Sequence, residues 1–177
     1  MCASVNGSIA RSSVRTGASL FLLLASACGV YTFTGGGGLP RHVDTIAIIP
    51  FENRTTQFTL TQEFTQALLD EVPGRLGLDL SDESTADAIM RGTIVRYDER
   101  AVNFDAEEGG PQIFQRRVDI SVTVEIYDTV EDRVLWSSQS LSAAGEYEPD
   151  SQSELEGRQI AIRELVRRII DGAQSQW

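Results

Sequence analysis

Cys28 is the residue whose type and position most clearly indicate chemistry. It follows a short apolar run, residues 20–25, and two small residues. The segment before this run carries two charges, Arg11 and Arg15, both positive. A positive segment, a short apolar run and small residues are typical of a secretion signal, because six apolar residues are far fewer than the roughly 20 that cross a bilayer as a helix. We therefore expect residues 1–27 to be removed as a signal peptide.

The residues before Cys28 resemble the lipobox of bacterial lipoproteins, in which a signal peptidase cuts before a cysteine whose thiol carries diacylglycerol. A lipobox usually has Leu three residues before the cysteine, whereas this chain has Ala25 there and Leu24 one residue earlier. The alternative is an ordinary signal cut near Ala27, which would leave a free thiol without an intrachain disulfide partner. The resemblance implies that Cys28 becomes residue one and carries covalent diacylglyceryl and N-acyl lipid.

Apart from the lipidation expected at Cys28, no group of residues indicates chemistry, and none indicates an enzyme. The single histidine, His42, follows a glycine-rich stretch, where we expect it neither to be positioned as a base nor to be joined by further His or Cys metal ligands. The chain has no Gly-x-Ser-x-Gly motif. Its acidic residues are expected on outer faces and loops, and a catalytic carboxylate pair assembled by the fold is the alternative. We predict a binding or assembly protein with no catalytic residues, no metal and no cofactor beyond the lipid.

The charge of the chain argues against nucleic acid as a partner. There is no lysine, and removal of the signal leaves 13 arginines against 26 acidic residues, a net charge of −13. Such a surface repels nucleic acid and anionic headgroups at long range, so membrane attachment must come from the lipid. The 177 residues, about 150 after cleavage, allow one domain with one core.

Four consecutive glycines, residues 35–38, separate Cys28 from the first predicted strand. A flexible tether of about 12 residues spans on the order of 20 Å, so the domain can stand away from the membrane. No Gly-Lys-Ser/Thr follows and Pro40 blocks an immediate helix, which argues against a phosphate-binding loop. We assign residues 28–42 to the lipidated cysteine and its tether.

A strand and an amphipathic helix follow the tether. The apolar run 43–51 predicts a central strand that is covered on both faces. The helix is predicted to begin at a weak capping box of Thr59 and Gln62 and to stop at Pro73. Its apolar stripe has a spacing of four residues and consists of Leu60, Phe64, Leu68 and Val72, whereas Gln62, Glu63, Gln66 and Asp70 lie on the opposite face.

Residues 118–127 show the clearest pattern in the chain, since five apolar residues alternate with five polar ones. This alternation predicts a strand with one buried and one wet face. Residues 128–132 then turn the chain into a second hairpin arm, residues 133–145. Upstream, residues 86–97 predict another strand and residues 78–80 a short one.

The last helix is predicted to begin at a capping box of Ser151 and Glu154. Its apolar stripe consists of Leu155, Ile162, Val166, Ile169 and Ile170, with Arg163, Glu164, Arg167 and Arg168 facing out. Ile160 falls off this stripe by about 140° on a wheel of 3.6 residues per turn. We interpret it as an ordinary exposed apolar residue, and a partner contact there is the alternative.

The acidic, glycine-rich stretch Asp105–Pro111 lacks periodicity and predicts a solvated loop. Its carboxylates match no known calcium-binding spacing.

Taken together, the predicted elements have the order β-α-(β)-β-β-β-α. This order favours an α/β (α+β) two-layer sandwich, in which a mainly antiparallel sheet carries two amphipathic helices on one face and leaves the other face wet or available to a partner. We assign residues 43–172 to this domain and residues 173–177 to a C-terminal tail.

Three blocks of sequence resemble the lipopolysaccharide-assembly lipoprotein family, LptE. They are the Cys-Gly-x-aromatic start at Cys28, the segment Leu39–Thr55 with its Ile-Ala-Ile-Ile-Pro-Phe-Glu-Asn motif, and residues 86–94, Ala-Asp-Ala-Ile-Met-Arg-Gly-Thr-Ile. The resemblance implies an α/β sandwich of two helices against a sheet. It also implies a lipid-anchored outer-membrane lipoprotein on the periplasmic side, which plugs the LptD barrel and helps deliver lipopolysaccharide to the outer leaflet.

The family is thought to contact lipopolysaccharide through basic residues on strands, which implies such a role for four arginines here. Arg96 and Arg100 share a face if their strand extends that far, and Arg116 and Arg117 begin the next strand. Guanidinium groups bind phosphate through two parallel hydrogen bonds, so these four residues are the candidate lipopolysaccharide contacts.

An alternative is that these arginines pair with Asp98, Glu99 or Asp119. The chain also departs from the family's expected pattern, because it lacks lysine and is strongly acidic. The arginines are therefore candidates for either lipid binding or ordinary ion pairs.

The motif Ile-Ala-Ile-Ile-Pro-Phe-Glu-Asn-Arg-Thr also resembles two other groups of envelope proteins. One is the lipoproteins that activate penicillin-binding proteins, and the other is the periplasmic part of the curli secretion channel. An activator would bind a peptidoglycan synthase, and a channel would need a membrane-inserting hairpin. Only one long alternating strand is visible in the sequence, so the secretion channel is the least favoured of these functional interpretations.

Overall fold

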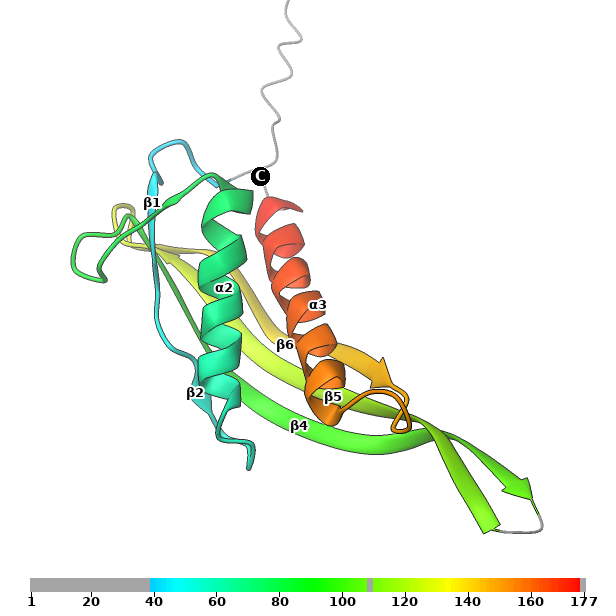
Figure 1. Ribbon diagram of the computed structural model, residues 1–177. Coiled ribbons are helices and arrows are strands. Elements are labelled where there is room, and N and C mark those ends of the chain that lie inside the picture. The colour runs from blue at the N-terminus through cyan, green and yellow to red at the C-terminus, as the bar shows by residue number, and fades with distance from the viewer. Residues whose placement is uncertain (1–38, 108–109, 176–177) are drawn as a thin grey trace, which may run out of the picture. The chain divides into compact units, whose positions relative to one another are not determined.

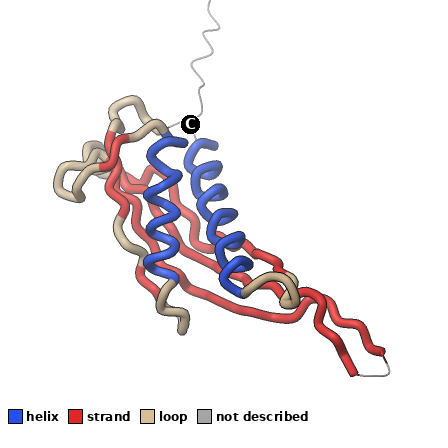
Figure 2. The backbone as a smooth tube through the Cα atoms, in the orientation of Figure 1, coloured by secondary structure: helices blue, strands red, loops and turns tan. Residues whose placement is uncertain are grey.

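The computed structural model describes residues 39–107 and 110–175. The chain divides into two units, residues 1–36 and 37–177, and the described residues all belong to the second. Within them a sheet carries two helices on one face (Figures 1 and 2). The strands are β1 (Thr45–Ile48), β2 (Glu52–Asn53), β3 (Asp79–Leu80), β4 (Ala88–Glu107), β5 (Gly110–Asp128) and β6 (Arg133–Tyr147), and the helices are α2 (Leu60–Leu76) and α3 (Glu154–Ser175).

The sheet has the order β3-β1-β4-β5-β6, and β2 pairs with β4 beside this path. The three long strands β4, β5 and β6 are antiparallel, whereas the short strands β1, β2 and β3 pair in parallel. The predicted two-layer α+β architecture with helices on one face is thus confirmed, and the sheet is mixed. Strand β1 is internal, as predicted, with β3 and β4 on its two sides.

The core is built on one face of β5. Its inward residues are each at most 3% exposed, and they are Val118, Ile120, Val122, Val124 and Ile126. The predicted alternation is therefore confirmed. Neighbouring strands continue this apolar layer, because Val122 lies opposite Ile94 of β4 and Leu141 of β6. Both helices pack their stripes onto this layer.

Helix α2 buries its predicted stripe of Leu60, Phe64, Leu68 and Val72. The prediction that it stops at Pro73 is wrong, because the helix continues to Leu76. One proline removes a single intrahelical donor, and the extra turn packs Leu76 against the core. The helix ends instead at Gly77, whose φ of 71° is left-handed and whose N–H donates to the Pro73 carbonyl. Glycine takes this conformation without a steric penalty.

The predicted capping boxes of both helices are wrong. Thr59 precedes α2 but makes no side-chain cap bond. Helix α3 is capped two residues later than predicted, because the Ser153 N–H donates to Oε2 of Glu156 at 2.7 Å. This pair has the same Ser-x-x-Glu spacing as the predicted pair of Ser151 and Glu154, so the motif alone fits both positions.

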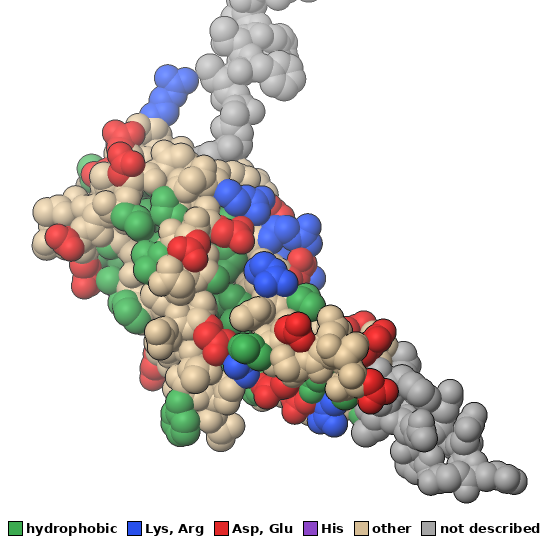
Figure 3. All heavy atoms as spheres, in the orientation of Figure 1, with side chains coloured by type: hydrophobic (Ala, Val, Ile, Leu, Met, Phe, Trp, Pro, Cys, Tyr) green, Lys and Arg blue, Asp and Glu red, His purple; other side chains and the backbone are tan. Residues whose placement is uncertain are grey.

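Helix α3 buries Ile162, Val166, Ile169 and Ile170 as predicted, but Leu155 is 44% exposed. The helix runs to Ser175 and buries Ala173, so it continues beyond residue 172, the predicted end of the domain. Its outward residues Arg163, Arg167 and Arg168 are exposed, as predicted, and Figure 3 shows arginine side chains on this helical side of the domain.

Helix α3 approaches β6 closely where both elements have glycine. A Cβ atom on Gly145 would lie 1.9 Å from the carbonyl oxygen of Gly157, and one on Gly157 would meet the Tyr147 ring at 2.6 Å. Any larger residue at Gly145 would therefore push the helix backbone away from the sheet. This contact fixes the distance between the two layers at one end of α3.

We predict that Val122→Asp lowers the free energy of unfolding by at least about 3 kcal/mol, because it places an unpaired carboxylate under both helices. Ser121→Asp is the matched control on the other face, where Ser121 lies opposite Arg96. This control should change the stability by less than about 1 kcal/mol. Urea unfolding followed by circular dichroism measures both, and equal stability of the two variants would contradict the assigned faces of β5.

Candidate functional site

Strands β4 and β5 extend beyond the rest of the sheet as a two-stranded arm (Figure 1). Pairing of β5 with β6 ends at Arg116↔Tyr147, whereas pairing of β4 with β5 continues from Ala101↔Arg116 to Glu107↔Gly110. We call the described residues of this continuation, 101–107 and 110–116, the arm. Beyond the Arg116↔Tyr147 pair, its described residues pair only with each other, so it projects from the domain as a candidate contact element.

The arm corrects the predicted loop at Asp105–Pro111. Asp105, Ala106 and Glu107 belong to β4, and Gly110 and Pro111 belong to β5. They pair as Asp105↔Gln112, Ala106↔Pro111 and Glu107↔Gly110. The segment itself shows no alternation that would indicate a strand. Its pairing follows from the long antiparallel register that the buried residues of β4 and β5 impose.

The four candidate arginines lie where the arm joins the sheet, on both of its faces. Cross-strand register places Arg96, Arg100 and Arg117 on the face that the helices leave open. Arg116 points to the helix side, where it lies opposite Tyr147. The predicted common face of Arg96 and Arg100 is confirmed, but the consecutive residues Arg116 and Arg117 are divided between the two faces.

Each of these arginines contacts a carboxylate of the chain. Asp119 lies between two of them: Nε of Arg117 donates to Oδ1 at 3.1 Å, and Nη2 of Arg100 lies 3.1 Å from Oδ2 as an ion pair without aligned hydrogen-bond geometry. Arg96 lies 3.5 Å from Asp98, and Nε of Arg116 donates to Glu99 at 2.8 Å. Three acidic partners are those that the alternative interpretation named, and Glu146 lies 3.8 Å from Arg117 as a fourth. An external phosphate must compete with them.

The cross-strand register nevertheless places two of these arginines side by side on neighbouring strands. Arg100 lies directly opposite Arg117, and Asp98 lies directly opposite Asp119. Like charges in directly opposite positions repel. Glu146 of β6, directly opposite Arg117 and 3.8 Å from it, and the diagonal Asp119 both reduce this repulsion. An anion placed between Arg100 and Arg117 would relieve the same repulsion.

A hollow of about 810 Å³ opens beside the edge strand β6 and brings these sheet residues near the helices. Arg117, Asp119 and Glu146 line it from the sheet, and Arg163 and Arg167 line it from α3. Arg163 forms no ion pair with any residue of the described part of the chain, in contrast to Arg167, which binds Glu164 at 2.7 Å. The sequence indicated only that these helix arginines face outward.

The two helices leave one face of the sheet open (Figure 2), and the middle of β4 and β5 carries polar side chains on this face. We define it by Arg91, Thr93, Ser121, Thr123 and Glu125. Arg91 and Glu125 are cross-strand partners whose Nη2 and Oε1 atoms lie 2.6 Å apart. Such exposed pairs contribute little stability, so this face is free to exchange its own ion pairs for those of a partner.

A network of polar side chains ties the base of the arm to the helices, and the sequence did not reveal it. Arg158 of α3 is 7% exposed. Its Nε and Nη2 atoms donate to Glu63 of α2 at 2.8 and 3.1 Å, and its Nη1 atom donates to Glu154 at 2.7 Å. The assignment of Glu63 to the outer face of α2 is therefore wrong, because its partner on α3 lies far away in sequence.

Tyr97 extends this network onto β4, and Tyr147 makes a separate polar contact between β6 and β4. The Tyr97 hydroxyl of β4 donates to Glu154, and burial together with this bond raises the pKa of Tyr97 to about 12. The Tyr147 hydroxyl donates to Glu99, which lowers the pKa of the Glu99 carboxyl. Burial alone would lower the pKa of Arg158, but its bonds to Glu63 raise it overall. Each of these polar groups is bonded to another side chain of the domain, so we assign the contacts a structural role.

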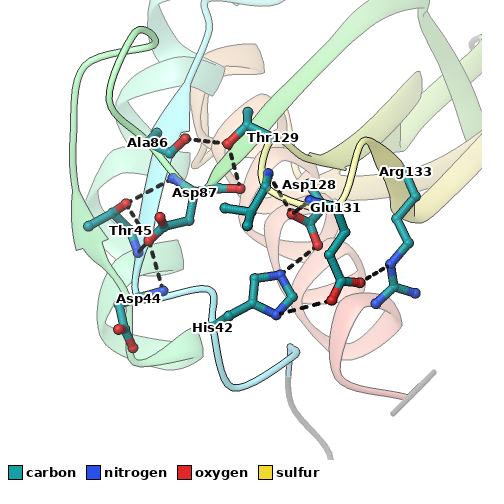
Figure 4. Close-up of polar contacts among 10 residues, drawn as sticks. His42, Asp44, Thr45, Ala86, Asp87, Asp128, Thr129, Glu131 and Arg133 are labelled. Atoms are coloured by element: carbon teal, nitrogen blue, oxygen red, sulfur yellow. Dashed lines mark hydrogen bonds and ion pairs between the residues drawn. The ribbon is translucent and has the colours of Figure 1, made fainter.

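The expectation that His42 cannot be positioned is also wrong. Its Nε2 atom lies 2.7 Å from Oδ2 of Asp128, at the end of β5 (Figure 4). Asp128 is buried, and its pKa is lowered: burial opposes this, but backbone N–H groups of Glu131 and Val130 and the His42 ring outweigh it. The sequence could not reveal this pair, because the two residues are 86 positions apart.

Cys28, the predicted lipidation site, lies outside the described residues. Among the described residues, no helix is long and apolar enough to cross a membrane. The membrane anchor therefore remains a prediction from the sequence.

A family model described as LptE, lipopolysaccharide-assembly, matches residues 43–175. The match includes every strand and helix given above. No curated protein matches the chain.

Solved structures share the fold at low sequence identity. The hypothetical protein CT253 from Chlamydia trachomatis has a TM-score of 0.52 at 13% identity, covering 76% of this chain and 99% of its own. The uncharacterized lipoprotein B from Nitrosomonas europaea has a TM-score of 0.51 at 14% identity, with coverages of 80% and 88%. The PelC dodecamer from Paraburkholderia phytofirmans has a TM-score of 0.50 at 17% identity, with coverages of 80% and 95%. At these identities the likeness concerns the fold alone.

Proposed function

The chain belongs to the LptE lipopolysaccharide-assembly family, and from this premise we propose that it is an outer-membrane lipoprotein that plugs the LptD barrel from the periplasmic side. In this role it assists the transfer of lipopolysaccharide to the outer leaflet and carries out no chemical reaction. The observation that carries the proposal is the family match over residues 43–175, which spans the whole folded domain.

The polar open face supports the docking part of the proposal. The interior of a large outer-membrane barrel is polar, so a plug needs polar side chains where it meets the wall. Arg91, Thr93, Thr123 and Glu125 supply such a surface beside the arm. Because the helices bury their apolar stripes on the other face of the sheet, the domain offers this surface without exposing its core.

Attachment to the membrane is proposed to depend on lipid at Cys28. A net charge of −13 after signal removal disfavours binding to anionic headgroups. Two or more acyl chains hold a protein stably at a bilayer, whereas one gives only marginal binding. A cysteine with diacylglyceryl and N-acyl groups meets this requirement.

Direct contact with lipopolysaccharide is proposed at the hollow beside β6. Arg117 and Arg163 line it together, and Arg100 approaches from the neighbouring strand. A phosphate group would accept hydrogen bonds from guanidinium groups and would displace Asp119 from Arg117. Arg96 and Arg116 keep their own carboxylate partners outside this hollow.

Photocrosslinking tests the proposed docking. A photoreactive residue at Thr123, on the open face, should capture an outer-membrane β-barrel in living cells. The same residue at Gln159, on the exposed side of α3, is the comparison: a plug enclosed by the barrel gives capture at both positions, and one-sided docking gives capture at Thr123 only. Capture of a peptidoglycan synthase, or of no partner, would contradict the proposal.

Replacement of the anchor cysteine tests the attachment. Cys28→Ser should move the protein from the membrane fraction to the soluble periplasmic fraction, because serine cannot accept the thioether-linked lipid. The comparison with the unchanged chain is made by fractionation and mass spectrometry of the N-terminus. Retention of the variant in the membrane without lipid would argue against the anchor.

Arginine and aspartate variants should shift lipopolysaccharide affinity in opposite directions. The double variant Arg117→Ser/Arg163→Ser should weaken binding about tenfold or more, since charge-assisted hydrogen bonds contribute about 1.5–3 kcal/mol each. Asp119→Asn should strengthen binding, because it removes the competing carboxylate. Arg91→Ser, on the open face but outside the hollow, is the control and should leave affinity unchanged. Equal affinities for all variants, measured by titration with fluorescent lipopolysaccharide, would refute this site.

A further inference from the structure

The ring of His42 is held between two carboxylates at the point where the chain enters the domain. Nε2 lies 2.7 Å from Oδ2 of Asp128, and Nδ1 lies 3.8 Å from Oε1 of Glu131 (Figure 4). We propose that Nδ1 of His42 and Oε1 of Glu131 bind a divalent transition-metal cation of the zinc type, and that Asp128 orients the histidine as a ligand.

Asp128 is built to hold the histidine in one orientation. Its side chain is fully buried. One oxygen, Oδ1, accepts the backbone N–H groups of Val130 at 2.9 Å and Glu131 at 3.0 Å. The other oxygen is left for His42. An ionised carboxylate only accepts hydrogen bonds, so Nε2 is the nitrogen that donates to Asp128, and Nδ1 is the nitrogen left for a metal ion.

This arrangement is the usual second shell of a metal-binding histidine. Such a histidine almost always donates its other ring N–H to a carboxylate, a carbonyl or water, which fixes the tautomer and raises the basicity of the ligating nitrogen. In this chain the carboxylate is Asp128, and the free nitrogen points toward Glu131 (Figure 4).

Glu131 offers one free oxygen on the same side of the ring. Its Oε2 atom accepts a hydrogen bond from Nε of Arg133 at 2.7 Å, which leaves Oε1 facing Nδ1. The separation of 3.8 Å is too long for a hydrogen bond. Two ligands bound at about 2.1 Å to one zinc ion lie about 3.0–3.4 Å apart, so a movement of roughly half an ångström would suffice.

The exposure of the two ligands leaves room for this movement and for water. The Glu131 side chain is 49% exposed and the His42 side chain 31% exposed, so water completes the coordination. An imidazole and a carboxylate suit zinc and similar ions, whereas magnesium and calcium prefer oxygen ligands alone. These three side chains lie close enough together for metal binding, and we assign them the roles of two ligands and one orienting group.

The position of the site gives the ion a structural consequence. His42 precedes β1, and Glu131 lies in the turn between β5 and β6. An ion between them would join the segment that enters the domain to this turn. Binding to the folded state alone raises stability, so the ion should stabilise the domain.

Zinc titration of the untagged mature chain carrying Cys28→Ser tests the proposal, since this change removes the remaining thiol that could bind zinc. Isothermal titration should show one zinc ion per chain, and magnesium should not compete. His42→Ala should abolish binding. Asp128→Asn should weaken it about 10- to 100-fold, the usual effect of losing an orienting carboxylate. Glu131→Gln should also weaken it, whereas Asp132→Asn, the matched control on the same turn, should not.

A nuclear magnetic resonance readout separates ligation from a simple change in stability. His42 is the only histidine of the chain, so its ring nitrogens give unambiguous signals. Zinc should shift the Nδ1 signal while Nε2 keeps its proton. Binding that survives His42→Ala, zinc on Nε2, or no binding at millimolar zinc would overturn the proposal and leave only an ion pair between His42 and Asp128.

Discussion

The burial of one face of β5 is the constraint on which the rest of the domain depends. Strand β5 lies between β4 and β6, and every second side chain from Val118 to Ile126 is buried in the core. The two-residue period then sends the residues between them to the opposite face. Helix α3 covers this first set, and α2 packs beside α3 over β1 and β2. The polar second set forms the surface that we propose a partner binds.

Two further contacts hold the helices at their places on this layer. Near the start of α3, glycines at positions 145 and 157 let the helix and β6 approach closely. Beside this contact Arg158 joins both helices through Glu63 and Glu154. Tyr97 of β4 joins this network through Glu154, and Tyr147 of β6 separately binds Glu99 of β4. The base of the arm is therefore fixed relative to the helices through Tyr97. The arm can therefore present its residues from a rigid support.

The fold was predictable where it depends on short-range periodicity. The alternation in β5 and the four-residue stripe of α2 each identify a buried face without reference to the rest of the chain. The wrong predictions concern positions whose structure is set by residues that lie far away in the sequence. Asp105–Glu107 and Gly110–Pro111 belong to strands because β4 and β5 remain paired as far as Glu107↔Gly110. Likewise Glu63 faces Arg158, 95 positions away, and His42 faces Asp128. The arginines at the base of the arm were found as candidates, but their division between two faces required the cross-strand register.

The central claim is that this domain works by docking into an outer-membrane barrel. Isolation of the native, lipidated protein from detergent-solubilised outer membranes, with identification of its partner by mass spectrometry, tests this claim most directly. The account predicts a stable complex with an LptD-type barrel that survives gel filtration. Elution of the chain alone, or together with a peptidoglycan synthase, would contradict it.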